Sequence, residues 1–229
     1  MDFFETVRTR RSIRKYSQKP VPPEVIQNAL NAALLAPNSS NLQTWEFYWV
    51  RSAQKKKELI EACFHQSAAR TAQELVVIVA NPSLWKITNP LMIEFIKKIQ
   101  APKMVQQYYE KLIPLTYGAN WLAPVKALGV WITGWFRPIS RGPLSFRDLQ
   151  EVSIKSAALA SENFMLAITA QGYCSCPMEG LDEKRVRSLL SLQRGSRVVM
   201  AISVGEEEPG KGTWGPQIRF DRNLFVKEV

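Results

Sequence analysis

The stretch Arg10-Arg11-Ser12-Ile13-Arg14 places three guanidinium groups and a hydroxyl close together in the sequence. A second stretch, Ala36-Pro37-Asn38-Ser39-Ser40-Asn41-Leu42-Gln43-Thr44-Trp45, supplies small amides and hydroxyls and leads into an aromatic segment. Clustered arginines repel one another unless an anion lies among them, and the planar guanidinium matches phosphate and carbonyl edges. The two stretches together favour a site for a phosphorylated cofactor. For the first stretch taken alone, a solvated basic helix end is the simpler interpretation.

The composition is that of a globular protein from a reducing compartment. The 229 residues are 46% apolar and 22% charged, which allows one large domain or two small ones with a sizeable core. Three cysteines are an odd number and argue against a disulfide framework. Cys174 and Cys176 lack a second pair of metal ligands, so we expect buried strand cysteines and no metal site.

The formal net charge of +10 is scattered along the chain. No zinc-finger spacing, helix-turn-helix pattern or aromatic-basic stacking motif accompanies it, so we expect no nucleic-acid partner. A diffuse positive field that attracts anionic cofactors is the more economical interpretation. No secretory leader and no apolar run of membrane-spanning length are visible, which predicts a soluble, cytoplasmic protein without membrane association.

Hydrophobic periodicity predicts a mixed α and β chain. Strands are expected at residues 45–50, 75–80, 173–176 and 197–204, and helices at 2–9, 25–34, 53–64, 146–170 and 182–190. Residues 83–112 are expected to be mostly helical and 113–145 irregular, with 127–135 either a strand or a buried helix. The alternating tail, residues 217–229, favours pairing with the sheet of another chain. Neither the glycine pattern of dinucleotide-binding folds nor that of phosphate-binding loops is present.

Several motifs, in the same order along the chain, resemble the FMN-dependent nitroreductase family. They are Arg10-Arg11-Ser12-Ile13-Arg14-Lys15-Tyr16, Val21-Pro22-Pro23-Glu24, the run from Ala36 to Phe47, Pro177-Met178-Glu179-Gly180, and Arg219 in the tail. The resemblance covers roughly residues 1–80 and 150–229 and leaves 81–147 unmatched.

The resemblance implies an α+β fold in which helices flank a central, mostly antiparallel sheet of four to five strands. It also implies an intertwined homodimer with swapped terminal segments and two FMN sites at the interface. Residues 1–229 would form a single FMN-binding domain, with an irregular aromatic and basic insertion at about 113–147.

The resemblance also assigns roles to individual residues. Arg10 and Ser12, with Arg219, would bind the phosphate and ribityl chain of FMN, and Arg11 belongs to the same cofactor-binding set. Arg14 would lie at the N1/C2 carbonyl edge of the flavin, where a cation stabilises the charge that builds up on reduction. The remaining cofactor-binding positions fall into two groups. One is Asn38, Ser39, Ser40 and Asn41, contributed by the partner subunit; the other is Pro177, Met178, Glu179 and Gly180, which would lie along the flavin with the backbone N–H of Glu179 or Gly180 facing N5.

The chain departs from the family pattern at three places. Thr44 stands where a proline is usual, and Gln217 stands where a lysine often precedes the tail arginine. Where members place an Asn and a Lys at the pyrimidine edge of the flavin, this chain has residues 65–70, with Gln66 and Arg70 as candidate replacements. These changes bear on the flavin potential and on the choice of hydride donor more than on flavin binding.

The activity implied is a ping-pong reaction. NAD(P)H would give hydride to flavin N5 and leave, and an electron-poor acceptor such as a nitroaromatic, a quinone or a free flavin would then be reduced in the same place. No catalytic side chain is required. The aromatic side chains of the middle segment, Tyr117, Trp121 and Trp131 among them, form either a substrate lid or ordinary packing.

Three alternatives stay open from the sequence. One is a reductive dehalogenase of the same superfamily, and another is a flavin-storage or redox-sensing protein without fast turnover. The third is membrane association through the basic, tryptophan-rich residues 113–147.

Overall fold

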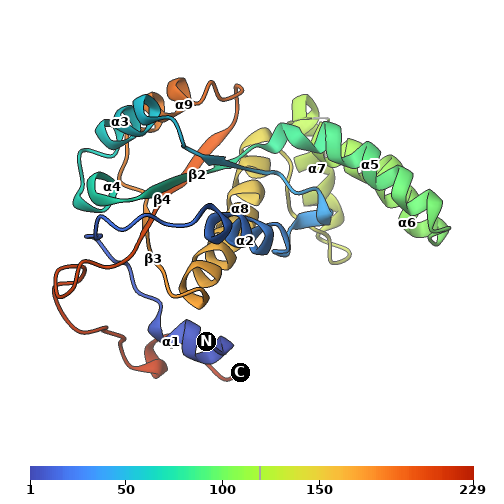
Figure 1. Ribbon diagram of the computed structural model, residues 1–229. Helices are drawn as coiled ribbons and strands as arrows, with labels where there is room; N and C mark the ends of the chain where they lie inside the picture. Colours follow the sequence, from blue (N-terminus) through green and yellow to red (C-terminus); the bar gives the residue numbers. More distant parts are fainter. Residues whose placement is uncertain (119) are drawn as a thin grey trace.

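The computed structural model describes residues 1–118 and 120–229. Four strands form one antiparallel sheet with the spatial order β1-β2-β4-β3 (Figure 1). Their bounds are β1 Trp45–Trp49, β2 Glu74–Ala80, β3 Cys174–Met178 and β4 Arg197–Gly205. This confirms the α+β class and the antiparallel sheet, and β3 extends two residues beyond the predicted strand.

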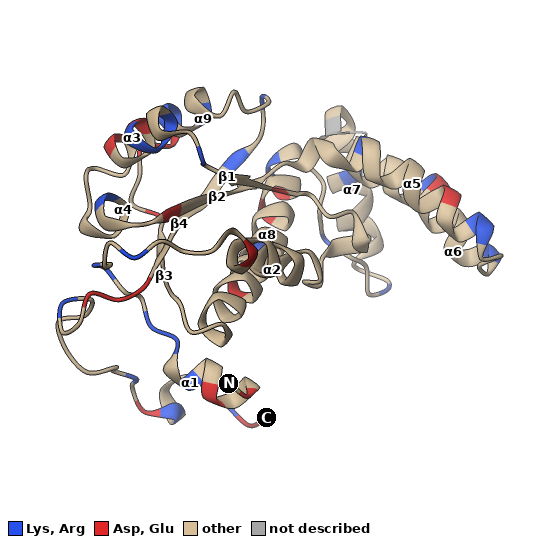
Figure 2. Ribbon diagram, in the orientation of Figure 1, with Lys and Arg blue, Asp and Glu red and all other residues tan. Residues whose placement is uncertain are grey.

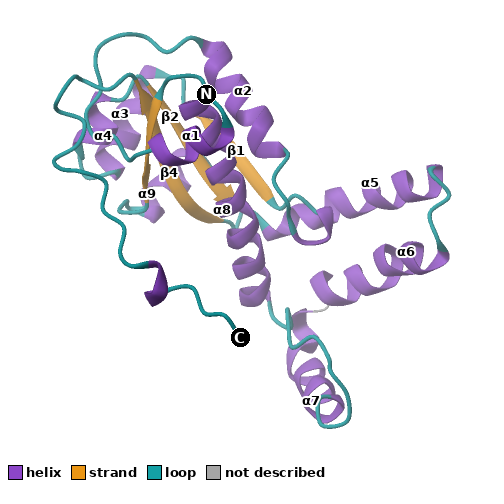
Figure 3. Cartoon of the chain, turned by 90° about the horizontal axis from the view of Figure 1, so that it is seen from below, coloured by secondary structure: helices purple, strands orange, loops and turns teal. Residues whose placement is uncertain are grey.

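The helices lie on both faces of the sheet and beyond its end (Figures 1 and 3). Their bounds are α1 Phe3–Thr9, α2 Pro23–Leu34, α3 Ala53–Ala62, α4 Ser67–Thr71, α5 Trp85–Lys98, α6 Lys103–Gln107, α7 Ala123–Thr133, α8 Phe146–Ala170 and α9 Glu183–Leu189. The helices predicted around residues 2–9, 25–34, 53–64, 146–170 and 182–190 are therefore all present.

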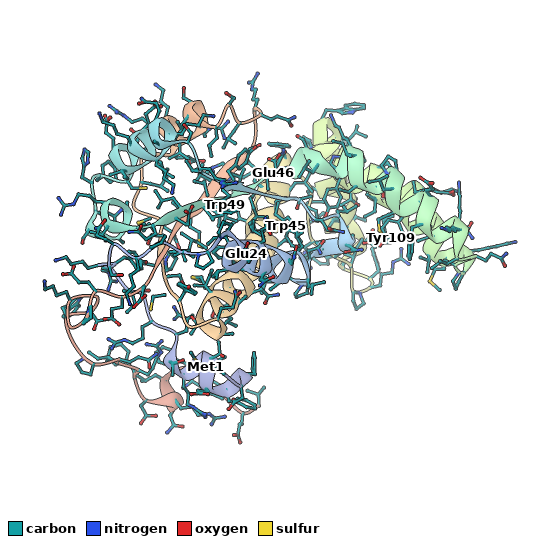
Figure 4. The ribbon with its side chains drawn as sticks, in the orientation of Figure 1. Met1, Glu24, Trp45, Glu46, Trp49 and Tyr109 are labelled. Atoms are coloured by element: carbon teal, nitrogen blue, oxygen red, sulfur yellow. The ribbon has the colours of Figure 1, made fainter. Side chains whose placement is uncertain are left out.

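Strand β2 lies in the centre of the core because both of its faces are apolar. Val76, Ile78 and Ala80 pack in one cluster with side chains of α2 and α8, and Trp45 belongs to the same cluster (Figure 4). The alternate residues Leu75, Val77 and Val79 pack against α3, α4 and α9 in a second cluster. A strand that is buried on both faces has apolar residues at consecutive positions. This pattern predicted β2 from the sequence.

Helix α8 is the long helix across the sheet, and its start is set by a capping box. The Ser145 hydroxyl accepts from the Asp148 N–H at 3.3 Å, and the Asp148 carboxylate accepts from the Ser145 N–H at 3.0 Å. Further N–H donation from Leu144 contributes to holding the pKa of Asp148 below its usual value. Gly172, at φ +84°, follows the end of the helix. One face of α8 is buried, while Leu159 on the other face is half exposed in the single chain.

Helices α5, α6 and α7, with the described residues that connect them to one another and to α8, form an arm that projects away from the sheet (Figures 1 and 3). The prediction that 83–112 is mostly helical is confirmed. The prediction that 113–145 is irregular is wrong for Pro114–Gly118, a π-helical turn, and for α7, and it is confirmed for 137–145, which contain no helix or strand. Neither alternative for 127–135 holds, because this segment belongs largely to a helix, α7, in which no residue is buried.

The tail, residues 217–229, is exposed and forms no strand within the described part of the chain. It contains a 3₁₀ helix at Arg222–Leu224, and large apolar side chains such as Ile218 and Phe220 face solvent. Pairing of this tail with another chain stays a prediction. Among the described residues, no helix has the length and hydropathy needed to cross a membrane.

Candidate cofactor-binding site

The arginine segment, residues 10–16, is an extended piece of chain held between β3 and the loop after β4. Ser12 forms a parallel bridge with Ser175, and the Ile13 N–H donates to the Ser175 carbonyl at 3.1 Å. On the other side the Arg14 N–H donates to the Gly212 carbonyl at 2.8 Å. Extended backbone alternates its side chains, so Ile13 is buried while Arg14 is exposed.

Tyr16 anchors the end of this segment inside the protein. Its ring is only 1% exposed, and its hydroxyl lies 3.1 Å from the Ser203 carbonyl and 2.9 Å from the Ser203 hydroxyl. Burial raises the pKa of Tyr16 well above its ordinary value, so the hydroxyl stays neutral. Gly205 lies directly beneath the ring: an added Cβ would be 2.7 Å from a ring carbon. The position of the arginines therefore depends on glycine at 205.

The first pocket lies between the arginine segment and the tail and has a volume of about 520 Å³. Its described lining carries four guanidinium side chains and no carboxylate. The lining residues are Arg10, Arg11, Ser12 and Arg14 on one side and Thr213, Trp214, Gly215, Pro216, Gln217, Ile218 and Arg219 on the other. Such a pocket suits an anion with several oxygen acceptors, because guanidinium forks bind phosphate oxygens in pairs.

The chain itself holds some of these arginines in place. The Arg11 guanidinium donates to the Gly215 carbonyl at 2.5 Å, and the Arg10 Nε is 3.7 Å from a Glu162 carboxylate oxygen on α8. With its amide oriented to satisfy both neighbours, Gln217 donates to the Arg8 carbonyl at 3.2 Å and accepts from Arg219 at 3.1 Å. Arg11 therefore fixes the tail, and Gln217 positions Arg219.

The second pocket, of about 230 Å³, lies along the end of β3 and shares Arg14 with the first. Its lining consists of Arg14, Gln66, Ser67, Ala68, Cys176, Pro177, Met178, Glu179 and Gly180. The Gln66 amide donates to the Gly180 carbonyl at 2.7 Å and so joins the start of α4 to this loop. An added Cβ on Gly180 would meet only Gln66 of the chain, at 3.9 Å. The chain's own packing does not require glycine there, and its absent side chain leaves room for a ligand.

The thiol in this pocket is a buried one, as predicted. Burial raises the pKa of Cys176, and the neighbouring Arg14 and Ser12 act in the opposite direction without reversing the shift. Burial also raises the pKa of Cys174, and that of Cys63 to about 11. All three thiols are free, and no cluster of three or more potential metal ligands occurs in the part of the chain that the structure describes.

The loop Asn38 to Asn41 lies elsewhere in the chain, in contact with the arm. Ser40 and Asn41 have positive φ angles of 54° and 50°. The Ser40 hydroxyl is 2.6 Å from the Tyr108 hydroxyl, and Tyr109, labelled in Figure 4, donates to the Ser40 carbonyl at 3.1 Å. The loop lines neither pocket, so its predicted contact with the cofactor depends on a second subunit.

The three predicted lid aromatics are placed differently from one another. Tyr117 is buried, packs with Trp85 at a ring-centroid distance of 6.2 Å, and donates to the Ser39 hydroxyl at 3.2 Å. Trp121 and Trp131 are exposed. Tyr117 is thus packed as a core residue of this chain, whereas the two tryptophans are free to meet something outside it.

Some lining residues were not identified from the sequence, and one was identified only as an alternative. Of the two candidates near the start of α4, Gln66 lines the second pocket while Arg70 does not. Residues 213–217, expected only as a loop and tail, form one wall of the first pocket. Gly212, directly before this wall, lies so close to the arginine segment that an added Cβ would be 2.7 Å from Ile13.

The two pockets, which share Arg14, form a strongly basic cleft at one side of an α+β fold. The family model described as Nitroreductase family matches residues 7–206, and the chain belongs to the nitroreductase family. A relative named NADH dehydrogenase, from Thermus thermophilus, is 27% identical over 201 residues, which are 86% of this chain and 82% of the relative.

Two solved structures show the same fold. A nitroreductase family protein from Streptococcus pneumoniae aligns with a TM-score of 0.73 at 21% identity, covering 100% of both chains. An NADPH:FMN oxidoreductase from Vibrio harveyi, complexed with NAD⁺, aligns with a TM-score of 0.67 at 20% identity, covering 99% of this chain and 76% of that one.

Proposed function

We propose that this protein is an FMN-dependent oxidoreductase that passes hydride from NAD(P)H to an electron-poor acceptor by a ping-pong mechanism. One observation carries the proposal. A pocket lined by four arginines and a pocket lined by a strand end and its loop share a single cation, Arg14. A ligand with an anionic end and an electron-accepting end fits such a pair. The names of the similar proteins, NADH dehydrogenase and NADPH:FMN oxidoreductase, point to the same chemistry.

The residues divide between the two ends of this ligand. Arg10, Ser12 and Arg219 would hold the phosphate, and Arg11 would keep the tail wall in place through Gly215. Arg14 would face the part of the ring where negative charge gathers on reduction. Bound there, FMN would supply the two-electron carrier between NAD(P)H and the acceptor, a nitroaromatic, a quinone or a similar compound.

The loop after β3 supplies backbone rather than side-chain chemistry. Pro177, Met178, Glu179 and Gly180 line the second pocket, and Gln66 holds Gly180 through its carbonyl. The free face of Gly180 allows the backbone to approach a flat ligand closely. The proposal includes no catalytic acid or base from this chain.

Residues 1–229 would act as a single FMN-binding domain within a homodimer. The loop Asn38 to Asn41 would complete the partner's site. The exposed apolar side chains of the tail and of α1, among them Phe220, Phe4 and Phe3, support burial against a second chain.

The deciding experiment is spectroscopic. The purified protein should be yellow, release FMN on denaturation, and be bleached anaerobically by NADH or NADPH, with colour restored by a nitroaromatic or a quinone. If the purified protein were colourless and bound no FMN when FMN was added in excess, the proposal would be overturned.

A further inference from the structure

The outer surface of the arm exposes an unusual amount of apolar side chain. No residue of α7 is buried, and Trp121 and Phe136 are 81% and 85% exposed. The rings of Trp131 and Trp135 meet edge to face with centroids 5.6 Å apart and both remain exposed. We name these residues the arm surface: Trp121, Val125, Leu128, Trp131, Ile132, Trp135, Phe136 and Ile139. Monomeric proteins seldom expose a large continuous apolar area without using it for binding.

The charged residues of the segment that carries the arm surface are all basic. Residues 111–147 contain no Asp or Glu and carry Lys111, Lys126, Arg137, Arg141 and Arg147. Over residues 81–147 as a whole, nine Lys and Arg against two Glu leave +7 of the chain's +10. Most of the net positive charge therefore lies in residues 81–147, because acidic residues are scarce there, and Figure 2 shows Lys and Arg positions on and beside α7.

The neighbouring helix α5 extends the same pattern. Ile87, Leu91, Phe95 and Ile99 recur every four residues, all of them exposed. Residues at this spacing share one face of a helix. Lys97, Lys98 and Lys103 lie at the distal end of α5 and the start of α6. The arm therefore combines two apolar helical surfaces with basic residues near their ends.

We propose that the arm surface docks on the face of an anionic phospholipid bilayer. Helices that lie in the membrane interface typically expose tryptophan and phenylalanine beside Lys and Arg. Their aromatic rings lie at the depth of the lipid headgroups, and their cations contact the lipid phosphates. An interface formed by the arm surfaces of two copies would instead bring like charges together without an acidic partner. The helices are too short and too interrupted to span, so the contact is interfacial.

The proposal does not depend on the flavin chemistry, and its test needs no activity. The full-length protein is mixed with sucrose-loaded vesicles of phosphatidylcholine alone and of phosphatidylcholine with phosphatidylglycerol, and the pelleted fraction is measured. We expect binding to the anionic vesicles, a blue shift of tryptophan fluorescence on binding, and loss of the bound fraction at high salt. No preference for anionic over neutral vesicles would overturn the proposal.

Matched charge-reversal variants test whether vesicle binding depends on the arm or on the positive charge of the protein as a whole. Reversing Lys126, Arg137 and Arg141 to Glu should lower the vesicle partition coefficient at least about ten-fold, whereas reversing the exposed Lys55, Lys57 and Arg194 to Glu should change it much less. Trp121→Ser combined with Trp131→Ser and Trp135→Ser should abolish the blue shift. Sedimentation velocity of each variant is measured in parallel. If the arm variants leave vesicle binding intact and convert a dimer to a monomer, the arm surface is an interface between copies and the proposal is wrong.

Discussion

In the arginine segment, basic side chains line a pocket while the apolar residues between them point into the core. In the arm, basic side chains stand beside tryptophans that the described part of the chain leaves exposed. Ile13 and Tyr16, before and after Arg14 in the sequence, are buried, whereas Trp135 and Phe136 next to Arg137 are among the most exposed side chains. The first arrangement holds cations at fixed positions for a small anion. The second leaves them free for an extended anionic surface.

Gly205→Ala is the change expected to have the largest effect on this comparison. The added Cβ would lie within 2.7 Å of the buried Tyr16 ring, so the ring and the arginine segment must move. We expect a loss of about 3 kcal/mol in the free energy of unfolding and a loss of FMN binding. Urea unfolding at fixed protein concentration and FMN titration measure both.

The matched control is Gly129→Ala in α7, where an added Cβ meets nothing within 4 Å. Alanine favours the helix, so this variant should gain up to about 1 kcal/mol. A similar loss in both variants would show that the two regions do not differ in packing.

Replacing single arginines tests the division of labour within the basic pocket. Arg10→Ala should weaken FMN binding about 10- to 100-fold, because a charge-assisted contact with phosphate is lost. Arg14→Ala should lower the flavin midpoint potential by about 30 mV or more, since the reduced flavin loses a neighbouring cation. Equilibrium titration and anaerobic potentiometry give the two quantities.

Arg141→Ala in the arm serves as the control and should change neither quantity. If Arg10→Ala and Arg14→Ala both altered only the affinity, Arg14 would not lie at the ring.

The two regions also differ in how far the sequence predicts them. The continuous β-branched run of β2 and the caps of α8 are local signals, and both elements were found where predicted. Helix α7 could not be placed in this way, because a segment apolar on all sides has the same periodicity whether it is buried or exposed. Only the tertiary structure shows that the described residues of the chain leave it unburied.

The sequence also predicts the candidate site only in part. The motifs around Arg10 and Pro177 were visible separately, and the bridge between Ser12 and Ser175 brings them to one place. The choice between Gln66 and Arg70 depended on the turn before α4. His65 has a positive φ of 51° in this turn, and residue type alone did not predict it.

Removing one tyrosine hydroxyl in each region compares a buried hydrogen bond with an exposed one. Tyr16→Phe leaves the buried Ser203 groups without their partner and should cost about 1 to 1.5 kcal/mol of unfolding free energy. Tyr108→Phe breaks the 2.6 Å contact with Ser40 near the surface and should cost less than about 0.5 kcal/mol. Parallel urea titrations of the two variants make the comparison. Equal costs would mean that the arm contact is as desolvated as the core one.

The smallest expected effect concerns a pair of glutamines that make the same bond in the two regions. Gln66 donates to the Gly180 carbonyl at 2.7 Å beside the second pocket, and Gln106 donates to the Ala101 carbonyl at 2.8 Å within the arm. Each alanine variant removes one amide donor, so each should cost well under about 1 kcal/mol in stability. Only Gln66→Ala frees a loop that lines the pocket, and it should weaken FMN binding a few-fold while Gln106→Ala leaves it unchanged. Fluorescence titration of FMN decides between them. Equal FMN affinities for the two variants would mean that Gln66 does not hold the loop at the ligand. The shape of the second pocket would then depend on β3 and Arg14 without Gln66.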